Sequence, residues 1–149
     1  MTDEQQPLPP PVVAFRMVLL AAQRLRYLMD ARLRPDGVTT QQAALLTVVS
    51  VLGHPTLGEA AAALATTHQN TAQLVASLER KGWLVSEPDP ADRRRRRLAT
   101  TEKNDAYWAG RNPDDHAAVA DWFSMLTDEE VATLAQLTSR LARGLETPN

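Results

Sequence analysis

The sequence contains no cysteine, no secretory leader pattern and no long apolar run. Without cysteine, the chain can form no disulfide, no thiolate zinc site and no cysteine-based redox switch. Its strongly apolar runs, such as residues 48–52, are far too short to cross a bilayer, and no cationic start precedes an apolar segment. We therefore expect a cytoplasmic protein with no membrane partner.

Sequence signatures of enzyme active sites are also missing. There is no glycine-rich phosphate loop, no nucleophile motif and no metalloprotease motif, so we expect no catalytic residue, no cofactor and no enzymatic activity. The histidines are His54, His68 and His116, and only His116 has carboxylates near it, those of Asp114 and Asp115. This spacing does not match a metal-ligand set, and we expect no bound metal.

The charge of the chain is unevenly distributed. The 149 residues are 44% hydrophobic, which is enough for one domain with a real core, and the formal net charge is −2. Residues 12–34 carry a net charge of +4 and residues 68–104 carry +3, whereas residues 105–149 carry −5. A basic centre of this kind is typical of a protein that binds a polyanion.

The N-terminal third predicts a loose arm followed by two helices. Residues 1–11 are polar and proline-rich and are expected to form a flexible arm. Residues 12–33 repeat apolar side chains at helical spacing, which predicts a long amphipathic helix. Thr39 or Thr40 can cap a second helix that runs through QQAALLTVVSVL to Gly53.

The next segment predicts two short helices joined by a tight turn. Thr56 is followed three residues later by Glu59, which is a capping box for a helix over about 57–65. Thr67 is a good N-cap for a second helix over about 68–81. The second helix has an apolar face and an amide-rich face, which is the pattern of a helix-turn-helix.

The C-terminal half predicts a β-hairpin and further helices. WLVSE and RLAT favour two antiparallel strands, with the arginine run of PDPADRRRRR at the tip and in the return strand. Thr101 can cap a helix that we expect to break at Gly110–Pro113. Thr127 and Glu130 form another capping box before a final helix. The predicted fold is mainly α with a small β-hairpin.

Together these elements resemble the MarR family of winged helix-turn-helix transcriptional regulators over about residues 12–146. The most specific part is LERKGWLVSEPDPADRRRRRLATTEK, residues 78–103, which is similar to the family's Leu-x-x-x-Gly hinge, its Asp-x-Arg wing element and its Thr-Glu-Lys helix start. Asp92 and Arg94 fill the wing element. The sequence departs from the family at Asn104, where glycine is frequent, and at Gly110–Pro113, within a helix that is usually continuous.

The resemblance implies a single domain, 12–149, after the flexible arm. Within it, residues 39–100 would be the winged helix-turn-helix DNA-binding region, and residues 12–34 and 101–146 would be dimerisation helices. The surplus of apolar surface on the first and last helices also favours a homodimer, and a two-fold protein implies an inverted-repeat operator in double-stranded DNA. The resemblance further implies a repressor that is released by a small aromatic or anionic effector.

The chemistry of the predicted surface favours DNA. Gln or Asn on an exposed helix can pair with adenine in the major groove, and arginines of an adjacent hairpin can enter the minor groove. The recognition-helix candidates are His68, Gln69, Asn70, Gln73, Ser77, Arg80 and Lys81. The wing candidates are Asp92, Arg93, Arg94, Arg95 and Arg96. Arg80, Lys81 and Lys103 are expected to contact phosphates, and Asp92 to hold one guanidinium.

Other functions remain open from the residues alone. The basic wing could dock on an acidic protein surface, or the chain could be a metal-dependent sensor or a small hydrolase. The exposed amides could be merely solvated, and Asp92 could only organise its turn. Sequence-selective DNA binding would distinguish a transcriptional regulator from all of these alternatives.

Overall fold

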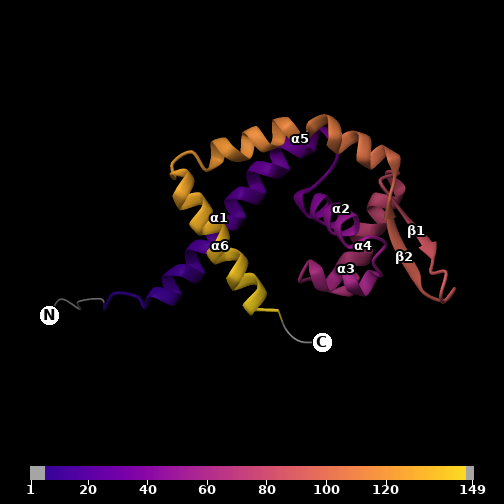
Figure 1. Cartoon of the computed structure of the whole chain (residues 1–149), viewed down its shortest axis with the longest axis horizontal. Coiled ribbons are helices and arrows are strands. Elements are labelled where there is room, and N and C mark those ends of the chain that lie inside the picture. The colour runs from indigo at the N-terminus through magenta and orange to yellow at the C-terminus, as the bar shows by residue number, and fades with distance from the viewer. Residues whose placement is uncertain (1–5, 147–149) are drawn as a thin grey trace. The chain divides into compact units, whose positions relative to one another are not determined.

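The computed structural model describes residues 6–146. The chain divides into two compact units, Met1–Tyr107 and Trp108–Asn149, each described below by itself. The elements are α1 (Pro10–Leu33), the 3₁₀ turn η1 (Arg34–Asp36), α2 (Thr40–Leu52), α3 (Leu57–Ala63), α4 (His68–Arg80), β1 (Leu84–Pro88), β2 (Arg96–Thr100), α5 (Glu102–Trp122) and α6 (Asp128–Gly144) (Figure 1). The predicted fold class, mainly α with one β-hairpin, is confirmed.

The first helix begins earlier than the sequence indicates. α1 starts at Pro10 rather than Val12, with Pro9 in an extended conformation before it. A proline at the first helical turn costs little, because its missing N–H would have no partner in the helix and its fixed φ is already helical. The end of the expected arm, 1–11, is therefore helical, and its residues 1–5 lie outside the described residues.

Capping boxes define the starts of three helices. The capping boxes pair Thr39 with Gln42, Thr56 with Glu59 and Thr127 with Glu130. In each box the threonine side-chain oxygen accepts the backbone N–H of the residue three positions later. The side-chain oxygen of that residue in turn accepts the backbone N–H of the threonine. These bonds confirm the predicted starts of α2, α3 and α6.

The core of the first unit lies where α2, α3, α4 and the hairpin meet. Its buried apolar side chains are Leu33, Val38, Leu45, Leu46, Val49, Ala60, Ala61, Val75, Leu78, Trp83, Leu84 and Leu98. The alanines let α3 approach its neighbours closely. Burying this set gives the helix-turn-helix a rigid body on which exposed side chains can be positioned.

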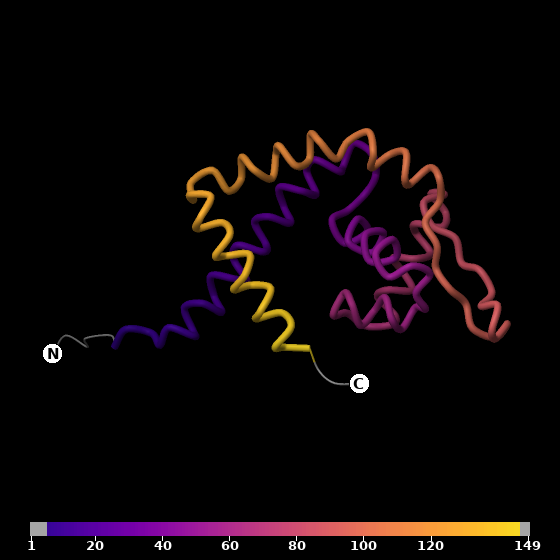
Figure 2. The backbone as a smooth tube through the Cα atoms, in the orientation of Figure 1, coloured from indigo at the N-terminus to yellow at the C-terminus, as the bar shows by residue number. Residues whose placement is uncertain are grey.

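The wing, defined here as residues 84–100, is an antiparallel hairpin that extends from this core. Its register pairs Leu84 with Thr100 at the base and Pro88 with Arg96 near the tip. Figure 2 follows the chain out along one strand and back along the other. An isolated bridge between Thr56 and Arg97 ties the returning strand to the start of α3.

The expected break at Gly110–Pro113 is absent, and this prediction is wrong. α5 runs without interruption from Glu102 to Trp122 and carries Pro113 in its interior. Proline removes one backbone donor and crowds one carbonyl, which weakens a helix locally but need not end it. A bidentate ion pair spans the proline, since the Arg111 guanidinium donates to both oxygens of Asp115 at 2.7 and 3.0 Å.

The C-terminal helix is strongly amphipathic but leaves its apolar side chains exposed. None of the described residues of α6 is buried. Its exposed apolar side chains are Leu134, Leu137, Leu141 and Leu145. Within residues 6–146, no single helix has both the length and the apolar composition needed to cross a membrane, and only α2 with α3, bent by 114°, reach these limits as a pair.

Candidate nucleic-acid interface

α4 is held in place by a cap at its start and by one buried face. Thr67 caps it by accepting the Asn70 N–H at 3.1 Å, after a turn in which Ala65 has a φ of 51°. Thr71, Val75 and Leu78 are buried against the core, as the sequence predicts. The opposite face is therefore fixed toward solvent.

That solvent face carries the polar residues that could meet a base edge. His68, Gln69, Gln73 and Arg80 are exposed, and Gln69 and Gln73 lie one turn apart on the same side of α4. Ala72 and Ala76 are the small side chains beside them on this face, so nothing bulky covers the two amides. This face has the shape and hydrogen-bonding capacity that major-groove recognition requires.

His68 packs on α3 as well as facing solvent. A Cβ placed on Gly58 would come within 3.2 Å of the His68 Cε1 atom, so the imidazole lies against the α3 backbone. The ring is thereby positioned at the first turn of α4. Glycine at position 58 is what leaves room for it.

Two expected contact residues of α4 and its C-cap residue Lys81 are engaged inside the protein. The Asn70 side chain is half-buried and donates from Nδ2 to Thr66 Oγ1 at 2.8 Å. Ser77 is turned toward α2, where its Oγ accepts the Gln42 Nε2 at 3.0 Å, so its expected place on the exposed face is wrong. Lys81 reaches back to the Gly37 carbonyl and to Gln42 Oε1. The buried Gln42 amide needs partners, and Ser77 and Lys81 provide them.

Lys103, expected to contact phosphate, also lies against the protein. Its Nζ donates to the Lys81 carbonyl at 2.6 Å and sits 5.4 Å from the centre of the Trp83 ring. Trp83 also meets Tyr107 edge to face, with centroids 4.5 Å apart. The Tyr107 hydroxyl donates to Asp36 at 2.8 Å. Lys103 therefore joins a cluster that holds the first turns of α5 to the end of α4.

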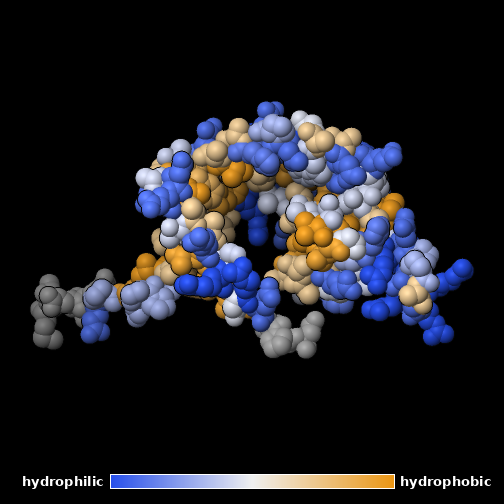
Figure 3. All heavy atoms as spheres, in the orientation of Figure 1, coloured by the Kyte–Doolittle hydropathy of each residue, from blue (hydrophilic) through white to orange (hydrophobic). Residues whose placement is uncertain are grey.

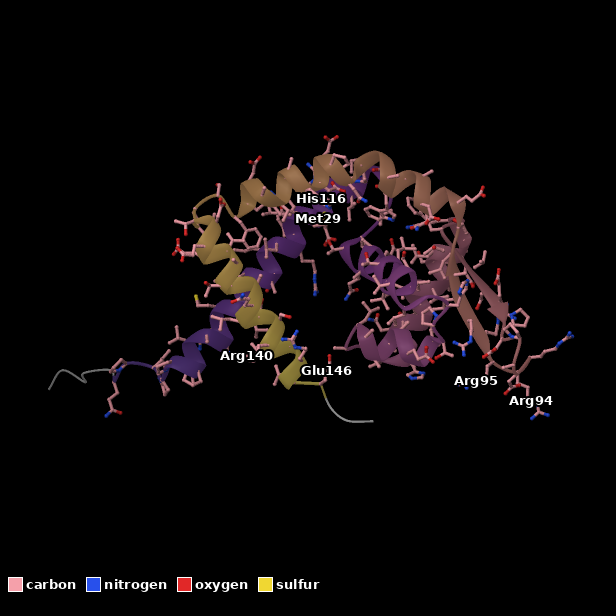
Figure 4. All side chains as sticks on the ribbon, in the orientation of Figure 1. Met29, Arg94, Arg95, His116, Arg140 and Glu146 are labelled. Carbon is pink, nitrogen blue, oxygen red and sulfur yellow. The ribbon has the colours of Figure 1, made fainter. Side chains whose placement is uncertain are left out.

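The tip of the wing carries the greatest density of positive charge. Arg93, Arg94, Arg95 and Arg96 are all exposed. In Figure 3 strongly hydrophilic side chains gather at the hairpin, and in Figure 4 Arg94 and Arg95 extend away from its tip. Arg96 differs from the other three because its guanidinium donates to the carbonyl and hydroxyl of Ser86 across the hairpin.

The carboxylate that holds a guanidinium in the wing is Asp89 and not Asp92. Asp89 Oδ2 accepts the Arg97 Nε at 2.8 Å, at the buried base of the turn. Asp92 lies at the tip, where its Oδ1 accepts the Arg94 backbone N–H at 3.0 Å and so organises the turn. The expectation for Asp92 is corrected because the hairpin register brings Arg97 back beside Asp89.

Sequence reasoning missed the role of Asp89 and its pairing with Arg97, which it had grouped with the other arginines of the run. The Ala91 N–H donates to Asp89 Oδ1 at 2.9 Å, which makes Asp-Pro-Ala an Asx turn. That turn pattern was available in the sequence as a signal for Asp89. The bonds from the Ala91 N–H and from Arg97 lower the pKa of the Asp89 carboxyl, so that it stays ionised at neutral pH.

The described residues contain no cluster of three or more His, Asp or Glu side chains that could hold a metal ion. His54 follows α2, His68 begins α4 and His116 lies in α5, so the three histidines are on separate elements.

Comparison with known proteins relates this surface to a family. Residues 36–95 match the model of the MarR family. The chain is 26% identical over 137 residues to the transcriptional repressor MprA of Escherichia coli K12, covering 91% of this chain and 78% of the relative.

Two solved structures share the fold. A MarR mutant from E. coli complexed with operator DNA is 22% identical, with a TM-score of 0.79 over 91% of this chain and 99% of the other. The Bordetella bronchiseptica protein BpsR, whose DNA binding is regulated by 6-hydroxynicotinic acid, is 19% identical, with a TM-score of 0.79 over 92% of this chain and 98% of the other. Residues 36–95 therefore match the MarR family of transcriptional regulators, and the chain as a whole shares the fold of these solved structures.

Proposed function

We propose that the chain is a sequence-specific, dimeric regulator that recognises the bases of double-stranded DNA with α4 and binds the adjacent backbone and minor groove with the wing. The observation that carries this proposal is the pairing of an exposed amide face on α4 with an arginine-rich hairpin on the same rigid core. A relative of the same fold has been solved with operator DNA, which supports it.

In this proposal α4 enters the major groove. Gln69 and Gln73 present amides that can pair with adenine N6 and N7, and each such contact is worth about 1–3 kcal/mol of discrimination. Arg80, exposed at the end of the helix, would contact phosphate. Asn70 keeps its Oδ1 for a base edge while its Nδ2 remains on Thr66. The proposed contacts exclude Ser77, Lys81 and Lys103, because their side chains form hydrogen bonds within the protein.

The wing is proposed to lie in the adjacent minor groove. Arg93, Arg94 and Arg95 would meet phosphates or the groove floor, where narrow A·T-rich segments concentrate negative potential. Asp92 supports them by fixing the turn at Arg94. In this arrangement α4 determines the sequence specificity, and the wing supplies most of the electrostatic attraction to DNA.

A homodimer is proposed from the apolar surfaces of the first and last helices. The exposed side chains include Val13, Phe15, Met17, Leu19 and Tyr27 on α1, and Leu134, Leu137, Leu141 and Leu145 on α6. Exposed apolar surface of this extent marks an interface, and a second copy of the chain would cover it. Residues 12–34 and 101–146 are therefore assigned to dimerisation and 39–100 to DNA binding.

Repression, and its release by a small aromatic or anionic effector, complete the proposal. The similarity to a transcriptional repressor supports the first, and the regulation of BpsR by 6-hydroxynicotinic acid supports the second. The protein is expected to act in the cytoplasm, where its operator would be accessible.

Selection of bound sequences from random duplex DNA tests this function. The expected product is an inverted repeat with half-site centres about 10 base pairs apart, because two symmetric helices must meet the same groove face. If the wing instead docks on an acidic protein, salt will still weaken the interaction, but no sequence will be enriched. Recovery of random sequences after several rounds would contradict the proposal.

A further inference from the structure

The five consecutive arginines of the wing do not share one role. We propose that Arg97 is a positioning residue, which locks the wing onto the α2–α3 connection and does not itself contact DNA. The inference rests on the proposed DNA-binding function, and it assigns the phosphate contacts of the run to Arg93, Arg94 and Arg95.

The Arg97 guanidinium joins two segments that are distant in sequence. Its Nε donates to Asp89 Oδ2 at 2.8 Å, and its Nη1 donates to the His54 carbonyl at 3.0 Å. The Asp89 side chain is only 6% exposed and that of Arg97 is 33% exposed. One cation therefore bridges the wing turn and the end of α2, and we call these three groups the wing lock.

Asp89 transmits the lock to the whole turn. Its second oxygen accepts the Ala91 N–H at 2.9 Å, and its own N–H donates to the Arg95 carbonyl at 2.8 Å. The Arg95 N–H donates in turn to the Asp92 carbonyl at 3.0 Å. The backbone that presents Arg93, Arg94 and Arg95 is thus tied to the carboxylate that Arg97 holds.

The other end of the lock is equally well defined. His54 has a φ of 54°, which is uncommon for a residue with a side chain, and it directs its carbonyl toward Arg97. The neighbouring Pro55 carbonyl accepts the Leu98 N–H at 2.8 Å, and Leu98 is buried. Two consecutive residues of β2 are therefore fixed on the core, one through its side chain and one through its backbone.

The positive charge of Arg97 is compensated within the wing by the Asp89 carboxylate. A guanidinium that already donates to a carboxylate and a carbonyl would have to break both bonds to reach phosphate. In contrast, the side chains of Arg93, Arg94 and Arg95 make no hydrogen bond or ion pair within the part of the chain that the structure describes. Arg93, Arg94 and Arg95 therefore remain available to neutralise phosphates and release counterions from DNA, whereas Arg97 does not.

Salt dependence of DNA affinity separates the two roles. Arg97→Gln should weaken binding to the selected duplex by roughly tenfold, because the wing must then be ordered on binding. Its slope of log affinity against log salt should equal that of the wild type. The matched control Arg94→Gln should make the slope shallower by about one, as expected for a lost phosphate contact.

Two further variants exclude a simple charge effect. Arg97→Lys keeps the positive charge but cannot reach both acceptors, so it should restore little of the lost affinity. Asp89→Asn should weaken binding as Arg97→Gln does, and the double variant should be no worse than either alone. Full rescue by lysine, or additive losses, would show that Arg97 acts through its charge on DNA.

Wing mobility gives a readout that needs no DNA. Because the sequence has no cysteine, Ala91→Cys provides a single labelling position at the wing turn. Arg97→Gln in this background should lower the fluorescence anisotropy of the label while the urea midpoint of the protein stays nearly unchanged. Unchanged anisotropy, or a salt slope shallower by about one, would overturn the wing lock. Failure of the wild type to select any sequence would instead overturn the proposed function.

Discussion

Asp30 on α1 receives two hydrogen bonds from Thr40, the first residue of α2. Its Oδ1 accepts the Thr40 hydroxyl at 2.6 Å and the Thr40 backbone N–H at 2.7 Å. These bonds lower the pKa of the Asp30 carboxyl below its ordinary value of 3.8, with the hydroxyl bond as the main cause. One carboxylate thus fixes the start of α2 to the end of the long first helix.

Replacing Asp30 with Asn, or Thr40 with Val, should each destabilise the fold by about 1 kcal/mol, because a hydrogen bond to a charged group is lost or weakened. Urea unfolding at a fixed protein concentration measures this loss. The double variant should lose less than the sum of the two single losses. Simple additivity would show that the pair contributes nothing beyond its separate side chains.

The contribution of Asp30 should also depend on pH. A carboxyl whose pKa is lower in the folded than in the unfolded chain stabilises the fold above the unfolded pKa. That stabilisation is lost as the pH falls through the depressed folded value, which lies below 3.8. The difference in unfolding free energy between wild type and Asp30→Asn should therefore be constant from pH 7 to 5 and shrink below about pH 4. A difference that keeps its full neutral-pH size down to pH 3 would contradict the assignment.

The sequence was a good guide wherever the determining interaction is local. Thr56 with Glu59 and Thr127 with Glu130 act within one helical turn, so their spacing alone locates a helix start. Pro113 does not break α5, because the local cost of the proline is outweighed by the rest of a 21-residue helix.

The candidate site was only partly predictable, because several of its determining interactions join residues that are distant in sequence. Which side of a recognition helix faces solvent depends on partners elsewhere, such as Gln42, which is 35 residues from Ser77. The contact of Arg97 with His54 spans 43 residues, and no pattern within the wing announces it. The exposed Gln69 and Gln73 were found because helical periodicity alone separates them from the buried Val75 and Leu78.

Two glycines should respond in opposite ways to the same substitution. Gly82 ends α4 with a φ of 77°, a conformation that costs a residue with a Cβ about 1 kcal/mol or more, so Gly82→Ala should destabilise the protein. Gly110 lies inside α5, where an added Cβ meets nothing within 4 Å, so Gly110→Ala should stabilise it by up to about 1 kcal/mol. Urea midpoints measure both. Destabilisation by Gly110→Ala would indicate that this surface of α5 is covered by a second copy.

The dimer proposal predicts that charge on α6 will separate the subunits. Leu137 and Leu141 are each about half exposed and lie one turn apart. Leu137→Asp with Leu141→Asp should yield a monomer in sedimentation at micromolar concentration, because burying unpaired carboxylates opposes association. Gln136→Asp, on the same helix, is the matched control for added charge. A wild-type monomer, or a dimer that survives both aspartates, would refute the assignment of this face.

The last prediction separates the reading helix from the wing by the physics of their contacts. Each phosphate that the protein neutralises changes the slope of log affinity against log salt by about 0.9, whereas a base-edge contact adds discrimination with little salt dependence. Arg94→Ala with Arg95→Ala should therefore weaken binding to selected and random duplexes alike and make the slope shallower by about two if both touch phosphate. Gln69→Ala and Gln73→Ala should lower the ratio of selected to random affinity and leave the slope unchanged. Gln136→Ala, far from α4 in sequence, controls for the loss of an amide. If both α4 variants select the same sequence as the wild type, the bases are not read by this face of the helix.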